Sequence, residues 1–423
     1  MPGGRNKTHR LGKVGIVKME PQPFAVSVRR VGRLSGLSVL CLLAVLPISP
    51  GRAAGPGGPG IPAATAPAAS PAMIEYRRKL EEYTKARQKF DDEASAYWKS
   101  IADKRRLRNA KRRANQAIVL EDYVLIQPPV YSGPPQPVDP SAPGPPPRPP
   151  RQYVPVVADF LKLAAEHFNF TPQRPHTEME YKRAYAKAAL AAGLTKPQIV
   201  RIYAFESGGN GGYDVQAGLE YNSPGARAIN SALGYNQLLN TNSVELLAEK
   251  GDRFIDALKA RAAGSSGETK AALERKIDAV RRMIAFSRTV PDDWNEHDKL
   301  ANTPRGFAVH ALNLDIDVGP LLQTQKLVDS VHFARSKGHT APLTAAELEM
   351  MNLTGDGNGL DMVMMPPALR DKVPTSNFFQ QGGYSRNPVA SRNNVVAKLI
   401  AATDAKMDRE VQLQGARDMA AAF

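Results

Sequence analysis

Glu206 is the residue of this sequence with the clearest potential for acid–base chemistry. Ile199, Ile202 and Tyr203 recur with the i, i+3, i+4 spacing of a buried helix face, and Glu206 is the next residue on that face. The glycine pair 208–209 then ends the helix. Burial at this open end raises the pKa of a carboxyl group, as a general acid near neutral pH requires. The alternative is a solvated glutamate, which is the common fate of Glu near a helix end.

The elements that position Glu206 are a short helix and the loop after it. Thr195 can cap the start of the helix, and Pro197 falls in its first turn, where no backbone N–H is missed. The loop that follows is rich in Gly, Asn and Ser, and residues 211–232 have room for one short strand pair. The carboxyl group is therefore expected at a junction between a helix and an irregular loop.

Three segments around this junction resemble the lytic transglycosylase and goose-type lysozyme family. The first is Phe205–Gly208 (FESG), the second Ser231–Leu239 (SALGYNQLL) and the third Glu349–Gly355 (EMMNLTG). The family pattern is an E-S segment, a glycine-bearing loop, a G-x-x-Q segment and an aromatic-Asn-Ala-Gly turn. Met351 departs from it, because the family usually has Tyr there. The resemblance covers roughly residues 177–365, with a long insertion before the third segment.

The resemblance implies a mainly α, lysozyme-like fold and cleavage of the bond between N-acetylmuramic acid and N-acetylglucosamine in peptidoglycan. Glu206 would be the single catalytic residue, and Asn352 would contact an N-acetyl group. The other substrate-binding residues implied are Ser207, Gly234, Tyr235 and Gln237. No metal and no cofactor are implied. A hydrolytic lysozyme would need a second carboxylate, for which Asp214 and Glu220 are the nearest candidates.

Residues 1–54 have the layout of a signal peptide. A basic stretch with Arg29, Arg30 and Arg33 precedes the apolar run 34–48, and small residues at 53–54 follow it. The run is short for a membrane span, although an uncleaved anchor is the alternative. Cys41, the single cysteine, lies within this run, so the chain from 55 onward has no thiol for a disulfide or a metal. We expect a periplasmic or secreted protein.

Three further segments precede the predicted domain. Residues 55–71 are a Pro/Gly/Ala linker, 72–126 a basic helical segment and 127–152 a Pro-rich, semi-rigid linker. Seven Lys and Arg residues fall within 104–113. They indicate either a solvated charged helix, a contact with an anionic wall or membrane surface, or a coiled coil with a partner. We expect no nucleic acid partner, because the chain is predicted to be exported.

The net charge of +15 belongs to the N-terminal part, since residues 1–54 contribute +8 and residues 72–126 contribute +5. Residues 153–423 are nearly neutral and form the predicted α-helical, lysozyme-like domain. The histidines show no metal-ligand spacing, and 356–361 matches a calcium loop poorly. Beyond the helix of Glu206, helices are predicted over 154–168, 178–192, 243–263, 268–288, 320–337, 344–351 and 390–421.

A different class of function fits the same segments. A non-catalytic peptidoglycan-binding or envelope-scaffold protein would keep the lysozyme-like fold and dock through the basic helix and the proline linker. Met351 and the long insertion favour this alternative.

Overall fold

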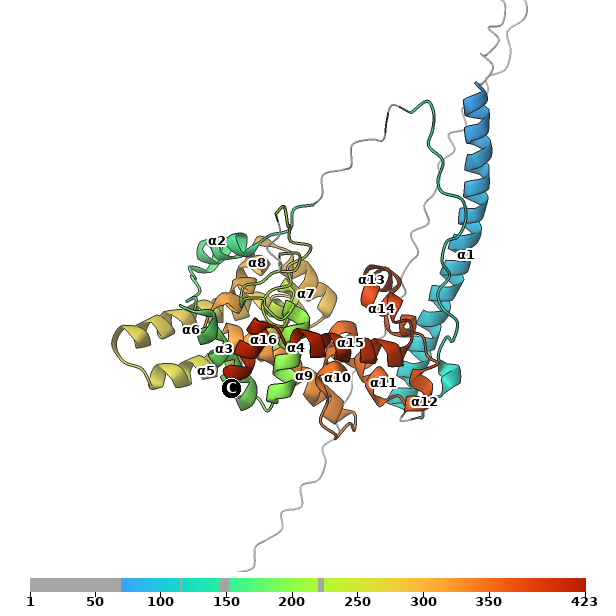
Figure 1. The fold of residues 1–423 in the computed structure, drawn as a ribbon. Helices are drawn as coiled ribbons and strands as arrows, with labels where there is room; N and C mark the ends of the chain where they lie inside the picture. Colours follow the sequence, from blue (N-terminus) through green and yellow to red (C-terminus); the bar gives the residue numbers. More distant parts are fainter. Residues whose placement is uncertain (1–69, 115, 143, 145–151, 220–223) are drawn as a thin grey trace, which may run out of the picture. The chain divides into compact units, whose positions relative to one another are not determined.

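The computed structural model describes residues 70–114, 116–142, 144, 152–219 and 224–423 (Figure 1). The predicted signal peptide 1–54 and nearly all of the linker 55–71 lie outside these residues. The prediction of a mainly α protein is confirmed, because helices alternate with loops and the described residues contain only isolated β-bridges, with no sheet. No helix of the described part combines the length and the apolar character that a membrane span requires.

Five helices form the first half of the domain that follows the Pro-rich segment. Two of them, α5 and α6, form an antiparallel hairpin (Figure 1). Gly251 of α5 lies at their contact, where a Cβ would come within 2.5 Å of Ile284. The glycine therefore allows the two helices to pack closely. The five are α2 (Val157–Phe168), α3 (Glu178–Ala191), α4 (Lys196–Ser207), α5 (Asn240–Ala263) and α6 (Gly267–Ser287).

The second half centres on α9, which packs against α3, α5, α10 and α11. Its Leu322 and Leu327 are fully buried in the main hydrophobic core. The helices of this half are α7 (Trp294–Ala301), α8 (Pro304–His310), α9 (Gly319–Ser336), α10 (Ala345–Thr354), α11 (Asp356–Met364), α12 (Pro367–Arg370), α13 (Gln381–Arg386), α14 (Pro388–Arg392), α15 (Val396–Glu410) and α16 (Gln414–Ala421). Two short 3₁₀ turns lie among them, η2 (Ala311–Leu314) and η3 (Thr375–Phe378), and a third, η1 (Leu120–Asp122), follows α1.

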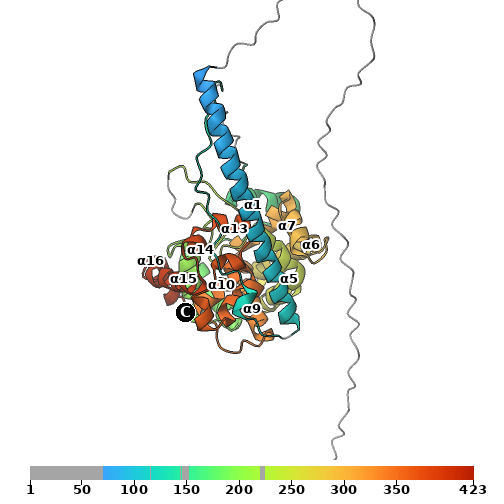
Figure 2. The same ribbon diagram turned by 90° about the vertical axis from the view of Figure 1, so that its right-hand side faces the viewer.

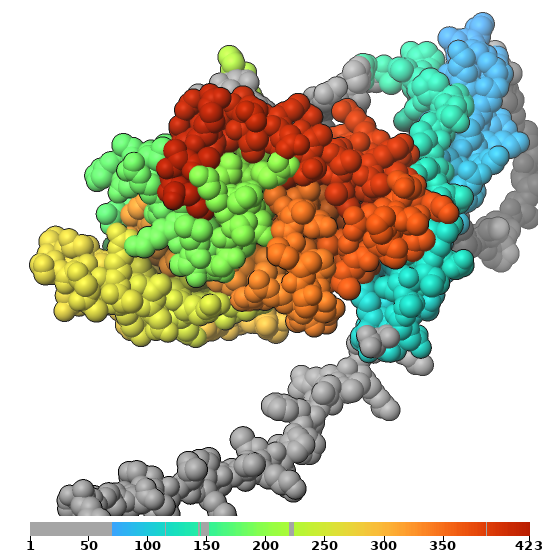
Figure 3. Space-filling view, turned by 60° about the horizontal axis from the view of Figure 1, so that its bottom comes forward, coloured from blue at the N-terminus to red at the C-terminus, as the bar shows by residue number. Residues whose placement is uncertain are grey.

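The last two helices cover α4, the helix of Glu206. Both α15 and α16 pack against it, and Figure 3 shows these red helices lying across the green segment. Gly209, directly after α4, has φ 72°, and a Cβ there would come within 2.6 Å of the carbonyl oxygen of Glu410. The glycine pair therefore ends α4 and also lets the C-terminal helices approach it closely.

The first helix, α1 (Pro71–Arg113), departs from the expectation of a separate basic segment held away by a proline spacer. Its second half packs beside the C-terminal helices (Figure 2). Tyr97 shares a 2.6 Å hydrogen bond with Ser376, and Arg108 is fully buried and donates to the carbonyl oxygens of Asp122 and Asn377, both at 3.0 Å. The high density of Lys and Arg suggested an exposed helix. Buried carbonyl and carboxylate oxygens can accept the hydrogen bonds of these side chains as water does, so the helix can also pack against the protein.

Part of the predicted Pro-rich linker also contacts α1. Tyr131 packs edge-on against Phe90, with ring centroids 5.5 Å apart, and against Tyr83. The guanidinium group of Arg87 lies over both the Phe90 and Tyr131 rings. The described stretch around Tyr131 therefore runs along the helix instead of only spacing it from the domain.

Candidate active site

The helix of Glu206 forms as its sequence predicts. Thr195 accepts a hydrogen bond from the backbone N–H of Gln198, and the Gln198 side chain accepts one from the N–H of Thr195, so a capping box starts α4. The helix ends at Gly208, whose φ of 63° is left-handed. Glu206 therefore lies on the last turn.

The predicted burial of one face of α4 is also confirmed, with Ile199, Ile202 and Tyr203 fully buried. Glu206 itself is partly buried. Burial raises the pKa of its carboxyl group, and hydrogen bonds from neighbouring groups lower it by less. The raised pKa agrees with the expectation from the sequence. It means that Glu206 keeps a proton at a higher pH than an exposed glutamate does.

Asn352 on α10 joins the first and third segments of the resemblance. Its Nδ2 donates a 2.7 Å hydrogen bond to Oε1 of Glu206, across 146 positions of sequence. The resemblance places Asn352 against a sugar N-acetyl group, whereas here it contacts the catalytic candidate directly. Its amide therefore orients the carboxyl group of Glu206.

Glu349, one turn before Asn352, is a site residue that the sequence analysis missed. It is 1% exposed and makes a side-chain hydrogen bond with Glu206. Its Oε2 is buried and meets no hydrogen-bond partner among the described residues. Burial, followed by the nearby Glu206, raises the pKa of Glu349 well above its usual range. The two carboxyl groups are therefore close neighbours, and the charge of one opposes the ionisation of the other. The available signal was the i, i+3 spacing of Glu349 and Asn352 on one helix face.

A cation on α15 faces the same pair. Lys406 Nζ donates to the carbonyl oxygen of Phe205 at 3.0 Å and lies 4.0 Å from the centroid of the Phe205 ring. Its charge lowers the pKa of both Glu206 and Glu349, against the larger effect of burial. The site therefore combines two carboxyl groups, one amide and one ammonium group.

The second segment of the resemblance forms a tight turn. Leu233 and Leu238 exchange backbone hydrogen bonds of 3.0 and 3.1 Å around Gly234–Gln237. Gly234 has φ 80°, and the Gln237 side chain donates back to the Gly234 carbonyl oxygen at 2.8 Å. Gln237 thus holds the turn closed in this structure.

The turn connects to α9 and to the neighbourhood of Glu206. Asn236 donates from its backbone N–H to Gln323 Oε1 at 2.9 Å and accepts from the hydroxyl of Tyr185, also at 2.9 Å. Burial raises the pKa of Tyr185, and the charge of Glu206 raises it further, which places this ring near the carboxyl pair. One tyrosine therefore links the second segment to the first.

Two implied substrate-binding residues are used inside the protein instead. Tyr235 is fully buried between the rings of Tyr181, Tyr185 and Tyr203, and its hydroxyl donates to Glu178. Ser207 is 2% exposed, and its hydroxyl donates to the carbonyl oxygen of Tyr203 at 2.6 Å. The resemblance implies that both residues bind substrate, whereas in this structure each side chain has a buried partner within the protein.

Of the two residues proposed for a hydrolytic outcome, Asp214 lies apart from this site. Asp214 forms an ion pair with Arg174, and no contact connects it to Glu206. Glu220 lies outside the described residues. The second carboxyl group that the structure places at the site is Glu349.

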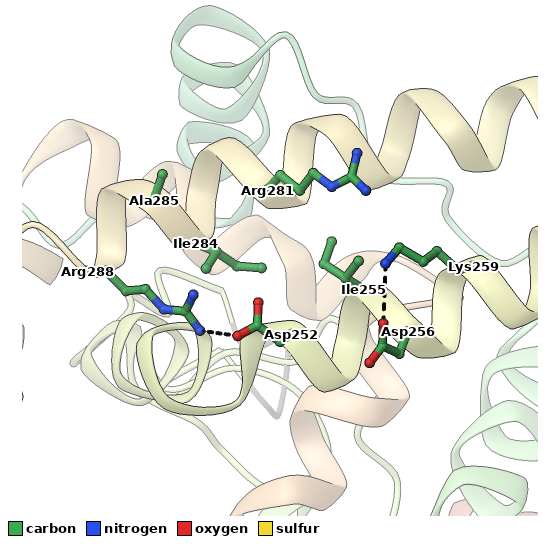
Figure 4. Close-up of a pocket in the computed structure, with 8 residues that line it drawn as sticks. All are labelled: Asp252, Ile255, Asp256, Lys259, Arg281, Ile284, Ala285 and Arg288. Carbon is green, nitrogen blue, oxygen red and sulfur yellow. Dashed lines mark hydrogen bonds and ion pairs between the residues drawn. The ribbon is translucent and has the colours of Figure 1, made fainter.

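The described cavities and charged clusters offer no cofactor or metal site beside Glu206. None of the three described cavities is lined by Glu206. Figure 4 shows one of about 370 Å³ between α5 and α6, where Asp252 pairs with Arg288 at 2.8 Å and Asp256 with Lys259 at 3.4 Å. Among the described residues no group of three His, Cys, Asp or Glu side chains has the arrangement of a metal site. The weak calcium-loop match falls within α11.

Comparison with family models, with curated proteins and with solved structures finds no match to this chain.

Proposed function

We propose that this protein cleaves peptidoglycan glycan strands as a lytic transglycosylase-like enzyme, with Glu206 as its acid and base. The contact between Glu206 and Asn352 carries the proposal. It joins two of the three segments on which the resemblance rests, and it orients a partly buried carboxyl group whose pKa is raised. A raised pKa lets the group hold a proton for a leaving oxygen near neutral pH.

The proposed reaction has two proton transfers through the same residue. Glu206 protonates the glycosidic oxygen between N-acetylmuramic acid and N-acetylglucosamine, and the C–O bond breaks. The N-acetyl group of the substrate stabilises the cationic centre that forms. Glu206, now a carboxylate, takes the proton of the 6-hydroxyl, whose oxygen closes a 1,6-anhydro ring.

The carboxyl pair supports this outcome over hydrolysis. Hydrolases of the two-carboxylate type separate the two groups by about 5–5.5 Å or by about 6.5–9.5 Å, which leaves room for the sugar or a water. Glu206 and Glu349 instead act on each other directly, since each shifts the pKa of the other. Glu349 is therefore assigned as a positioning residue that shares the proton of Glu206, and not as a second nucleophile or base.

The runner-up is a non-catalytic peptidoglycan-binding or scaffold protein. The observations that favour it are the internal contacts of Ser207 and Tyr235. In both proposals the chain is exported to the periplasm or beyond. Recovery of the protein only from cytoplasmic fractions would contradict that shared part.

The deciding experiment incubates the purified protein with isolated sacculi and identifies the soluble products by mass spectrometry. We expect 1,6-anhydro muropeptides from the wild type and a loss on the order of 10⁴ in rate for Glu206→Gln, since Gln cannot transfer a proton. The Asp214→Asn protein is the matched control and should cleave like the wild type. Reducing-end products would indicate a lysozyme, and sedimentation with sacculi without products would indicate the binder.

A further inference from the structure

A second cavity, remote in sequence from Glu206, lies between the last turn of α1, the C-terminal end of α9, and helices α11 and α12. Its volume is about 870 Å³, which is within the roughly 300–1,000 Å³ of small-molecule sites in proteins. The proposed glycan cleavage does not use this cavity. Its chemistry can therefore be considered by itself.

The charged side chains of this cavity are mostly cationic. Arg112, Arg113 and Lys337 line it, and Asp361 is the one carboxylate in the lining. Asp361 is already paired with Arg112, and the buried Nε of Arg108 lies 3.7 Å from it. The cavity thus has more positive charge than its own carboxylate neutralises.

Two of these cations have no acidic partner. Arg113 and Lys337 are exposed and form no ion pair within the described part of the chain. The Nε of Arg112 is buried and lacks a hydrogen-bond partner there. Unused donors at a cation-rich cavity indicate an anionic ligand, since guanidinium groups bind carboxylates and phosphates through paired N–H donors.

The remainder of the cavity wall is apolar. Phe333, Met364 and Leu369 are among its lining residues, and Met364 is 50% exposed. An exposed methionine beside other apolar side chains is typical of adaptable binding surfaces. A ligand that fits both parts of the wall has an acidic head and an apolar chain.

We propose that this cavity binds a single-chain anionic amphiphile of the fatty-acid class. The carboxylate lies against Arg112, Arg113 and Lys337, and the alkyl chain covers Phe333 and Met364. The sequence predicted that 104–113 contacts an anionic surface, and this proposal assigns that contact to Arg112 and Arg113 alone. Arg105, Arg108 and Lys111 of the same stretch already contact other parts of the protein. The proposal does not depend on glycan cleavage.

The test measures binding of dodecanoate to the full-length protein by calorimetry, below the micelle concentration of the ligand. Dodecyltrimethylammonium has the same tail with a cationic head, and hexanoate has the same head with a short tail. We expect dodecanoate to bind at least about tenfold more tightly than either, because only it satisfies both the cations and the apolar wall. Equal binding of the three ligands, or none at all, would overturn the proposal.

Variants locate the site. Arg113→Glu and Lys337→Glu reverse exposed charges at the cavity, and Met364→Asp places a charge on its apolar wall; each should weaken dodecanoate binding about tenfold or more. Arg77→Glu, on the exposed first half of the same helix α1, makes the same charge change and should have no effect. An effect of Arg77→Glu as large as that of Arg113→Glu would mean that net charge alone attracts the ligand. Adsorption to anionic phospholipid vesicles without binding of dodecanoate would equally exclude the single-chain site.

Discussion

At the scale of single residues, the proposed chemistry depends on the neighbouring carboxyl groups of Glu206 and Glu349. Two carboxyl groups in contact cannot both ionise easily, so the pair keeps its last proton beyond the pH at which an exposed glutamate loses it. Glu206 was predictable because it follows a buried face and a glycine stop. Glu349 was not, because its own neighbours are apolar and its partner lies on another helix.

Glu349→Gln should move the pH dependence of glycan cleavage without abolishing it. The amide keeps a hydrogen bond to Glu206 but removes the neighbouring negative charge, so the pKa of the proton on Glu206 falls below that of the last proton of the pair. The decline of activity with rising pH should then begin at a lower pH than in the wild type. Rates of sacculus solubilisation from pH 4 to 9 measure this limb, and a profile superimposable on the wild type would exclude the shared proton.

His310 should make the protein less stable in mild acid. It is fully buried, Nδ1 lies 2.8 Å from Ser243 Oγ and Nε2 lies 2.8 Å from the carbonyl oxygen of Ser231, and burial lowers its pKa to about 4. The unfolded chain binds a proton near pH 6.5, so stability is full above that pH and falls as the pH drops towards 4, by about 3 kcal/mol in all.

Urea unfolding at pH 7 and pH 4.5 checks this dependence. The loss of unfolding free energy between these pH values should be about 2–3 kcal/mol smaller in His310→Gln than in the wild type. The exposed His332→Gln serves as control and should keep the loss of the wild type. An unchanged loss in His310→Gln would contradict the assignment.

At the scale of elements, the turn of the second segment depends on the backbone of Gly234. Its φ of 80° is costly for any residue with a Cβ, and a Cβ would lie 2.5 Å from Nε2 of Gln323. Gln323 cannot move aside, because it is fully buried and bonded to Leu233, Asn236 and Asn313.

Gly234→Ala should therefore destabilise the protein more than strain alone would. Gly193 has φ 82° and nothing within 4 Å of a built Cβ, so Gly193→Ala measures the backbone strain by itself, about 1–2 kcal/mol. Overlap with Gln323 adds about 1–3 kcal/mol in Gly234→Ala. Denaturant midpoints of the two variants give the comparison, and equal losses would show that the turn relaxes around the methyl group.

The long amphipathic helices were the elements that sequence predicted best, since α2 to α6 and α9 begin and end within three residues of the expected positions. The predicted helix 390–421 is three helices, α14, α15 and α16, and the breaks between them fall at 393–395 and 411–413. The segment 356–361, considered above as a calcium loop, belongs to α11, although glycine disfavours helix. Contacts with other helices, which the local sequence does not show, set the bounds of these helices. The helices α7 and α8 were not predicted because they are too short for a hydrophobic periodicity to be recognised.

At the scale of the whole molecule, α1 and the residues around 377 form one packed unit. Asn377 accepts hydrogen bonds from Arg108 and from the backbone N–H of Val124, and its own amide donates to the Val124 carbonyl oxygen. Tyr123, Phe378 and Val396 belong to the hydrophobic cluster at this contact. The domain boundary expected at residue 153 therefore cuts through a core.

A chain that begins at residue 153 should lose order around η3. Without residues 70–152 the backbone carbonyl oxygen of Asn377 loses Arg108 and its side-chain Oδ1 loses the N–H of Val124, and each such buried group costs about 1–3 kcal/mol. Hydrogen exchange at 375–379 should be fast in this shortened chain and slow in a chain that begins at 70. Equal protection in both would show that η3 is held without α1.

The distance in sequence between Arg108 and Asn377 also sets an order of events during synthesis. At about 5–20 residues per second, the ribosome adds the 269 residues between them over roughly 15–50 s. During that time Tyr97 and Arg108 of α1 lack their partners Ser376 and Asn377. Closing so large a loop is slow, so the docking of α1 is expected to be a late folding event, at which the emerging protein is most exposed to aggregation and to chaperones.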